Sequence, residues 1–279
     1  MGSVAVIVKG MLQQEQRSGR VVMGYLLGFA VMGYWMSGFL RYAADTGEPV
    51  NILETFCVVE QHYVNMLFLV LGWLLAAADA PFIKGNLYLL LYRCGRKRWN
   101  MGMIFYILMQ AFLYAGAMAA FSIIASSFLG FAGDIWSSPA YALALDTGNH
   151  IGVKYNITFP WLEMMKTMSV PQAFAVTFLF FYLYLAFLGV LLYTSALLFS
   201  RNAGMAAVMG VHLAGYLQMM DGHMETSLLA RAIPGNYIDG TLSYLQSAAL
   251  FLSMIVVLTA LSFLIVNSIE FDSGTEVEG

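Results

Sequence analysis

Thr167–Ser200 reads TMSVPQAFAVTFLFFYLYLAFLGVLLYTSALLFS, and no residue in this stretch carries a charge. A helix needs about 20 largely apolar residues to cross roughly 30 Å of hydrocarbon. The stretch is long enough for one crossing, and it lacks the alternation of apolar and polar residues that is typical of a barrel strand. Because backbone polar groups in lipid must be satisfied within the segment, it predicts a transmembrane helix.

Five further uncharged stretches of at least 18 residues occur along the chain. The longest, 99–133, has 35 residues, which is too short for two crossings and a turn and therefore predicts one long helix. The fold class that follows is all-α: a polytopic membrane protein with six transmembrane helices. The expected spans are 21–40, 62–79, 101–126, 173–199, 203–220 and 248–269.

The composition supports the same class. Hydrophobic residues make up 60% of the 279 residues and charged residues only 10%, against roughly 25% charged residues in ordinary globular domains. These numbers exclude a soluble domain, a disordered chain, a disulfide-stapled secreted module and a nucleic-acid binder. The expected organisation is a cytoplasmic or interfacial segment at 1–20 without a cleaved signal peptide, a transmembrane domain at 21–270 and an acidic cytoplasmic tail at 271–279.

The lysines and arginines predict the orientation. With six spans, nine of the 13 basic residues fall on the side of the two termini and four on the other side. Basic residues accumulate in cytoplasmic loops, so we expect both termini in the cytoplasm and a multi-pass protein in the cell membrane. Cys57 then lies in an outer loop and Cys94 in a cytoplasmic loop, so the two cannot pair within one monomer.

The first outer loop, 41–61, contains four acidic residues and one arginine, and we expect it to be a solvated cap. No expected span carries Asp, Glu, Lys or Arg away from its ends. This argues against an ion-coupled or proton-coupled transporter, because such proteins need titratable groups near the middle of the membrane. The acidic residues of the loop are Asp45, Glu48, Glu54 and Glu60.

The loop between the second and third spans, 79–99, reads DAPFIKGNLYLLLYRCGRKRW. Pro81 ends the second span, and Asn86 could cap a short helix that reaches Arg93. One interpretation is a topology clamp, in which the basic cluster holds the loop inside and contacts anionic lipid; charge alone favours it. The other is a protein-docking helix. The headgroup and topology residues in either interpretation are Arg96, Lys97, Arg98 and Trp99.

This Pro-Phe turn, Leu/Tyr-rich helix and Arg-x-Gly-Arg-Lys-Arg-Trp sequence, followed at once by a span, resembles permease subunits of ABC type-2 transporters. It is most similar to the small six-span permease-like proteins of Gram-positive bacteria. The resemblance implies that 86–93 is a coupling helix that docks into a groove on a separate ATPase. The ATPase-docking candidates are Leu87, Tyr88, Leu90, Leu91 and Arg93.

The resemblance further implies a bacterial ABC exporter of an apolar or amphipathic substrate, with a second permease copy in a homo- or heterodimer. It also implies a short outer re-entrant helix at Met224–Ile233, ended by Pro234-Gly235. The acidic tail and the weakly patterned sixth span depart from the family. The dipeptide Gly-Lys does not occur, so this chain has no Walker A site, and ATP would bind only on the partner subunit.

The alternative function is a membrane-embedded enzyme or sensor that uses His212, Asp221, His223 and Glu225. His223 and Glu225 flank one residue and would point to different faces of a helix, so they could share a metal only from a turn. The ligand set is incomplete, and a hydrated outer cluster is the simpler interpretation. We therefore expect no catalytic, cofactor or metal site in this chain.

Two patterns within the spans have a structural and a functional interpretation. Tyr182 and Tyr193 are 11 residues apart and lie on roughly one helix face, where packing is the favoured interpretation and a translocation surface the alternative. Gly24-x-x-x-Gly28 matches the close-packing pattern of membrane helices. Because glycine is common in this chain, a chance spacing is the favoured interpretation.

Overall fold

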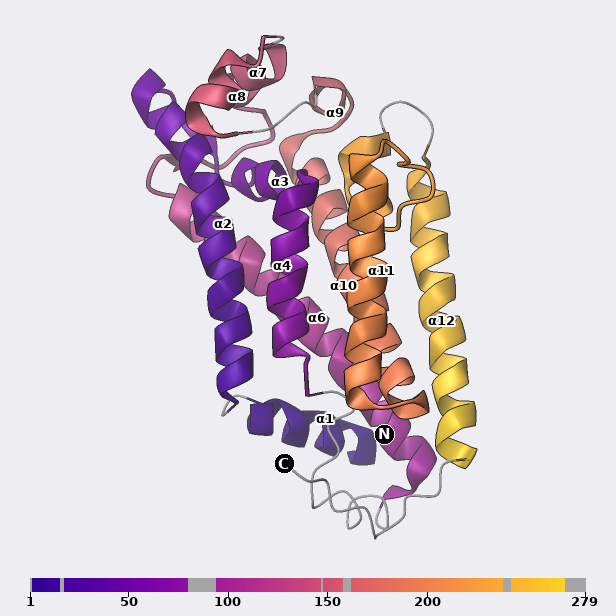
Figure 1. Cartoon of the computed structure of the whole chain (residues 1–279). Coiled ribbons are helices and arrows are strands. Elements are labelled where there is room, and N and C mark those ends of the chain that lie inside the picture. Colours follow the sequence, from indigo (N-terminus) through magenta and orange to yellow (C-terminus); the bar gives the residue numbers. More distant parts are fainter. Residues whose placement is uncertain are drawn as a thin grey trace.

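The computed structural model is a bundle of long helices (Figure 1). Five of them are long and apolar enough to cross a membrane, which confirms the predicted all-α, polytopic membrane character. Their bounds agree with five of the expected spans to within five residues, except that α2 extends six residues further at its C-terminal end. The five are α2 (Gly19–Thr46), α6 (Arg96–Ser126), α10 (Val170–Leu198), α11 (Arg201–Met220) and α12 (Tyr244–Ser268).

The expected second span differs from the other five. It consists of α4 (Tyr63–Ala76), preceded by α3 (Glu54–Glu60), and the two helices are bent by 93° relative to each other. At 1.5 Å per residue α4 is about 21 Å long, which is shorter than the hydrocarbon layer. The described residues therefore give five spans, or six if the bent pair counts as one.

The structure describes most of the chain. The predicted coupling helix 86–93, including the ATPase-docking candidates, lies outside the described residues. So does the acidic tail. The described residues are 2–15, 18–79, 94–146, 148–157, 162–237 and 242–268.

Helix α10 forms the centre of the bundle and packs against α6, α11 and α12. Its first turn is fixed by a capping box between Ser169 and Gln172, with a proline in the first turn where no hydrogen-bond donor is needed. Large aromatic side chains on α10, including Phe181, Tyr184 and Tyr193, are fully buried. Because they fill the space between the helices, the centre of a single chain is closed by side chains.

Helices α2 and α4 cross at glycines. A Cβ atom on Gly24 would lie 2.5 Å from the backbone oxygen of Gly72, and one on Gly28 would collide with the hydroxyl of Tyr114. Gly24-x-x-x-Gly28 is therefore a helix-crossing motif, and the expectation of a chance spacing was wrong. The absence of side chains lets the two backbones approach closely, as in other membrane helix pairs.

Short elements lie at the two ends of the bundle. Helix α1 (Gly2–Glu15) lies crosswise at one end, where Ile7 packs against Gly102 of α6 (Figure 1). The opposite end carries a layer of short elements, which together with α3 we call the cap. Its other members are the parallel strands β1 (Val50–Asn51) and β2 (Gly130–Phe131) and the helices α7 (Ser138–Leu145), α8 (His150–Tyr155) and α9 (Leu162–Thr167).

The segment after α11 also folds back onto the bundle, but not as the expected helix at Met224–Ile233. It forms turns and two short 3-10 helices, η1 (Ala230–Ala232) and η2 (Pro234–Tyr237). The side chain of Ser227 binds the carbonyl of Gly215 at 2.7 Å, which ties the segment to α11. Burial raises the pKa of Tyr237 to about 12, so its hydroxyl keeps the proton that it donates to a backbone carbonyl in this segment.

Candidate functional site

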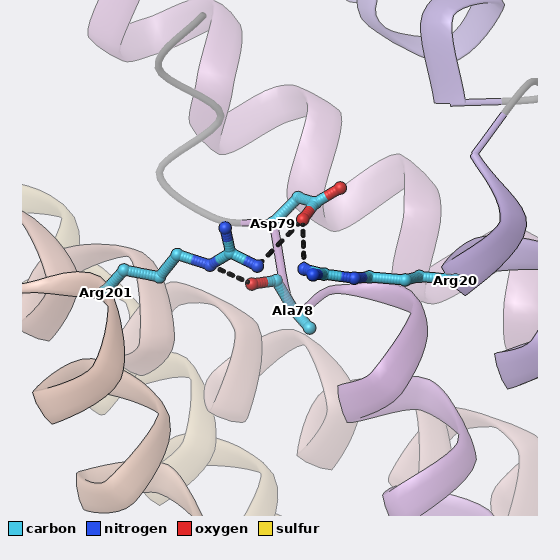
Figure 2. A network of polar contacts seen from close by, with 4 residues as sticks. All are labelled: Arg20, Ala78, Asp79 and Arg201. Carbon is cyan, nitrogen blue, oxygen red and sulfur yellow. Dashed lines mark hydrogen bonds and ion pairs between the residues drawn. The ribbon is translucent and has the colours of Figure 1, made fainter. Parts of the chain in front are cut away.

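Three charged side chains meet at the end of the bundle where α1 lies (Figure 2). Asp79 Oδ1 accepts from Arg20 at 2.7 Å and from Arg201 at 3.0 Å, and Arg201 Nε also donates to the carbonyl of Ala78 at 2.9 Å. Arg20 is in the first turn of α2, Asp79 follows α4, and Arg201 begins α11. We call Arg20, Asp79 and Arg201 the Asp79 node.

The Asp79 node positions the end of α4 more than it stabilises the fold. The arginine side chains are about half exposed, at 54% for Arg20 and 46% for Arg201, and ion pairs of this kind contribute roughly 0–1 kcal/mol each. Asp79 is the last described residue before the gap that contains the predicted coupling helix. The node therefore fixes the point where the chain leaves α4 and ties that point to α2 and α11.

The basic cluster next to this gap lies at the start of α6. Arg96, Lys97 and Arg98 are exposed, as a headgroup-contacting cluster would be. Trp99 differs from the expectation of a membrane-interface anchor: it is fully buried, and its ring lies 6.3 Å from that of Tyr193. The indole is thus part of the bundle interior, because the helix turn that exposes the basic residues points Trp99 toward α10.

The two tyrosines of α10 lie in different environments. Tyr193 is fully buried and donates to Asn100 Oδ1 at 2.7 Å, while Asn100 Nδ2 donates to Ser262 at 3.0 Å. This chain of contacts links α10, α6 and α12. Tyr182 is half-buried against the edge of Phe112. The geometry agrees with packing, and a translocation role for the pair stays a prediction.

The four residues of the alternative enzyme or sensor site do not come together. His212 is buried in α11, where Nε2 donates to the carbonyl of Leu67 at 3.2 Å and Nδ1 accepts from the Tyr184 hydroxyl at 2.9 Å. The other three lie in an exposed turn that begins nine residues later. Within the described ranges, no three His, Cys, Asp or Glu side chains are placed to hold one metal ion.

The cap contains two acidic residues that the sequence analysis placed in water. Asp45 and Glu48 are exposed as expected, but Glu54 is 0% and Glu60 1% exposed. The expectation of a uniformly solvated loop was therefore wrong, because α3 inserts between α2, α6 and α10 instead of lying on the surface. A signal was present in the sequence: the residues between the two glutamates, TFCVV, form an apolar stretch with no turn-forming residue.

The two buried carboxyl groups differ in their hydrogen-bond partners. Glu54 accepts from the backbone of Asn51 at 3.2 Å and from the backbone and hydroxyl of Ser137 at 2.5 and 2.6 Å. It thereby ties α3 to β1 and to the start of α7. Glu60 has no hydrogen-bond partner for either carboxyl oxygen among the residues that the structure describes.

At one end of the bundle, the Asp79 node connects α2, the end of α4 and α11. At the bend between α3 and α4, the buried carboxyl group of Glu60 has no hydrogen-bond partner among the described residues. Comparison of the chain with protein-family models, with curated proteins and with solved structures gives no match.

Proposed function

We propose that this chain is the permease subunit of an ATP-driven ABC transporter in the cell membrane, with energy from a separate ATPase subunit. The observation that carries the proposal is the Asp79 node. It ties the base of the predicted docking segment to the first turns of α2 and α11. A displacement of that segment by an ATPase would therefore reach three helices of the bundle at once.

The direction of the chain follows from its charges. Arg20, Arg201 and the basic cluster at the start of α6 all lie at the end of the bundle where α1 lies. The positive-inside rule predicts that this end is cytoplasmic, as docking of a cytoplasmic ATPase to the segment after Asp79 requires. Helix α1 would lie along the inner headgroup layer, in the manner of other interfacial helices.

The packing of the bundle favours a dimer. The centre of one chain is filled by buried aromatic side chains of α10, such as Phe181, Tyr184 and Tyr193. A transport path for an apolar or amphipathic substrate would therefore form between two permease copies, in a homo- or heterodimer. The proposed activity is export, and the reaction at ATP belongs to the partner subunit.

The docking segment can be tested by a pair of variants in the full-length protein. Leu90→Asp places a charge on the expected ATPase-facing side, where an unpaired charge in a desolvated contact commonly costs several kcal/mol. We expect it to abolish ATPase co-purification while the chain still inserts, because no span is altered. The measurement is ATPase recovered per permease chain after affinity purification from native membranes.

The matched control neutralises Arg96, Lys97 and Arg98 together. About 1 kcal/mol per basic residue near an anionic leaflet is at stake, so we expect this variant to disturb orientation or lipid contact instead. If the topology clamp is the whole role of the loop, Leu90→Asp should be tolerated. An inserted, correctly oriented Leu90→Asp chain that keeps full ATPase association would contradict the docking assignment.

A further inference from the structure

Glu60 is the last residue of α3, at the 93° bend into α4. Its side chain is 1% exposed, and in the described part of the chain neither carboxyl oxygen has a hydrogen-bond donor. None of the ion pairs among the described residues includes it. A buried carboxylate without a partner is far more costly than a buried neutral acid, so the surroundings favour the protonated form.

The groups around Glu60 do not supply a compensating positive charge. It interacts electrostatically with the thiol of Cys57, on its own helix, and with the phenol of Tyr114 on α6. The Tyr114 hydroxyl already donates to the carbonyl of Leu69 at 2.9 Å. Helix α10 contains no charged residue, and α2 contains none between Arg20 and Arg41.

The adjacent amide is committed to other contacts. Gln61 Nε2 donates one hydrogen to Thr177 at 3.1 Å and the other to Met164 Sδ at 3.7 Å, and Gln61 Oε1 accepts from the backbone of Gly235 at 3.3 Å. Gln61 therefore links α3 to α10 and to η2 and cannot also serve Glu60 with that donor. The contacts of Gln61 thus hold the bend in place, while the carboxyl group of Glu60 has no hydrogen-bond donor among the described residues.

Two further polar groups lie on the α4 side of the bend. Asn65 Nδ2 donates to the carbonyl of Val59 at 2.9 Å, and the side chains of His62 and Asn65 interact with each other. Apart from this contact, Asn65 Oδ1 and His62 Nδ1 have no hydrogen-bond partner among the described residues. Both side chains line a small, partly open cavity of about 10 Å³ beside Val59, and the Glu60 carboxyl group is not part of its lining. This is about the space that one water molecule needs, and polar groups that lack partners are where a buried water binds.

We propose that Glu60 is a proton-binding site, which holds its proton in the conformation described and releases it when water reaches the carboxyl group at the bend. In the release step the carboxyl O–H bond breaks, the proton bonds to the water oxygen, and the carboxylate keeps the electron pair. Since an ionised Glu60 is unstable in the closed surroundings, proton release and opening of the α3–α4 bend are linked. This property is independent of ATPase docking.

The test is infrared spectroscopy of the purified, full-length protein in lipid nanodiscs at pH 8, where ordinary carboxyl groups are ionised. We expect a carboxylic-acid carbonyl band in the unmodified protein, its loss in Glu60→Gln, and its retention in Glu54→Gln. Glu54 is the matched control, since it is equally buried but accepts three hydrogen bonds. An acid band that is unchanged in Glu60→Gln would overturn the proposal.

A second measurement needs no variant. A hydrophobic carbodiimide reacts with protonated, buried carboxyl groups, and mass spectrometry of the digested protein locates the adduct. We expect the adduct on the peptide that contains Glu60, with a yield that falls as pH rises. Equal modification of Glu60 and of the exposed Glu48 at pH 8 would contradict the proposal, because it would show that Glu60 behaves like a solvated carboxyl group.

Discussion

Asp79 at the α1 end and the two buried glutamates of the cap use their carboxyl groups in opposite ways. At the α1 end, Asp79 stays partly exposed and binds two arginines. In the cap, Glu54 and Glu60 are buried without any arginine or lysine: Glu54 is satisfied by neutral N–H and O–H groups, and Glu60 has no partner among the described residues. The role of each carboxyl group therefore depends on its burial and its partners. Asp79 positions helices, Glu54 connects parts of the cap, and Glu60 is proposed to hold a proton.

The largest expected effect concerns the side of the membrane on which each end of the bundle lies. Cys94 is at the α1 end, and Val153 of α8 is 77% exposed in the cap. We expect a membrane-impermeant thiol reagent to label Val153→Cys in intact cells and to leave Cys94 unlabelled, with Cys94 labelled in inside-out vesicles. Cys57 is buried, so it does not interfere. Labelling of Cys94 in intact cells would contradict the predicted orientation, because it would place the α1 end outside the cell.

The next prediction separates the two buried glutamates. Glu54→Gln replaces one acceptor oxygen of a group that accepts three hydrogen bonds, each of which contributes about 0.5–1.5 kcal/mol, whereas Glu60→Gln replaces an acid by an amide of the same shape. We expect Glu54→Gln to lower the free energy of unfolding by about 2 kcal/mol and Glu60→Gln by less than about 1 kcal/mol. Denaturant unfolding of both variants in one detergent measures this. Equal losses of unfolding free energy would show that Glu54 and Glu60 contribute alike to the stability of the cap.

At the α1 end, we expect helix packing to matter more than charge. Gly24→Ala places a Cβ against backbone atoms of α4, and overpacking of this kind costs about 1–3 kcal/mol. Gly33→Ala on the same helix is the matched control, since its Cβ would lie 3.6 Å from Phe121, an ordinary contact. We expect a lower thermal midpoint for Gly24→Ala and an unchanged or higher one for Gly33→Ala. The same shift in both would remove the role of the glycine crossing.

The smallest effect on stability is expected for Asp79→Asn. It removes two half-exposed ion pairs, each of which contributes at most about 1 kcal/mol. We expect its thermal midpoint to lie closer to that of the unmodified chain than the midpoint of Gly24→Ala does. The difference should shrink further at high salt, because exposed charges are screened. A loss larger than that of Gly24→Ala would show that the node stabilises the fold and does not merely position the loop.

Much of the fold could be predicted from the sequence, because long uncharged stretches have one physical solution in lipid. The same reasoning failed at residues 41–61. A glutamate close to the edge of an apolar stretch was interpreted as a solvated residue, yet Glu60 is buried because α3 turns inward before α4 begins. The bend depends on tertiary contacts of Gln61 with α10 and η2, which no local pattern contains.

The site was predictable only in part. His212 lies within a span, where polar side chains usually face protein or a cavity, and its contacts with Tyr184 and Leu67 show that it faces protein. The Asp79 node was not predicted, because it joins residues 59 and 122 positions apart in the chain. Gly24-x-x-x-Gly28 was underestimated, since only the partner surface of α4 distinguishes a crossing motif from a chance spacing.

The central claim is that this chain works with a separate ATPase, and affinity purification of the unmodified, tagged chain from native membranes tests it most directly. We expect an ABC ATPase to co-elute at about one copy per permease chain and to hydrolyse ATP in the purified complex. Elution of an intact, correctly inserted chain without any ATPase would contradict the account.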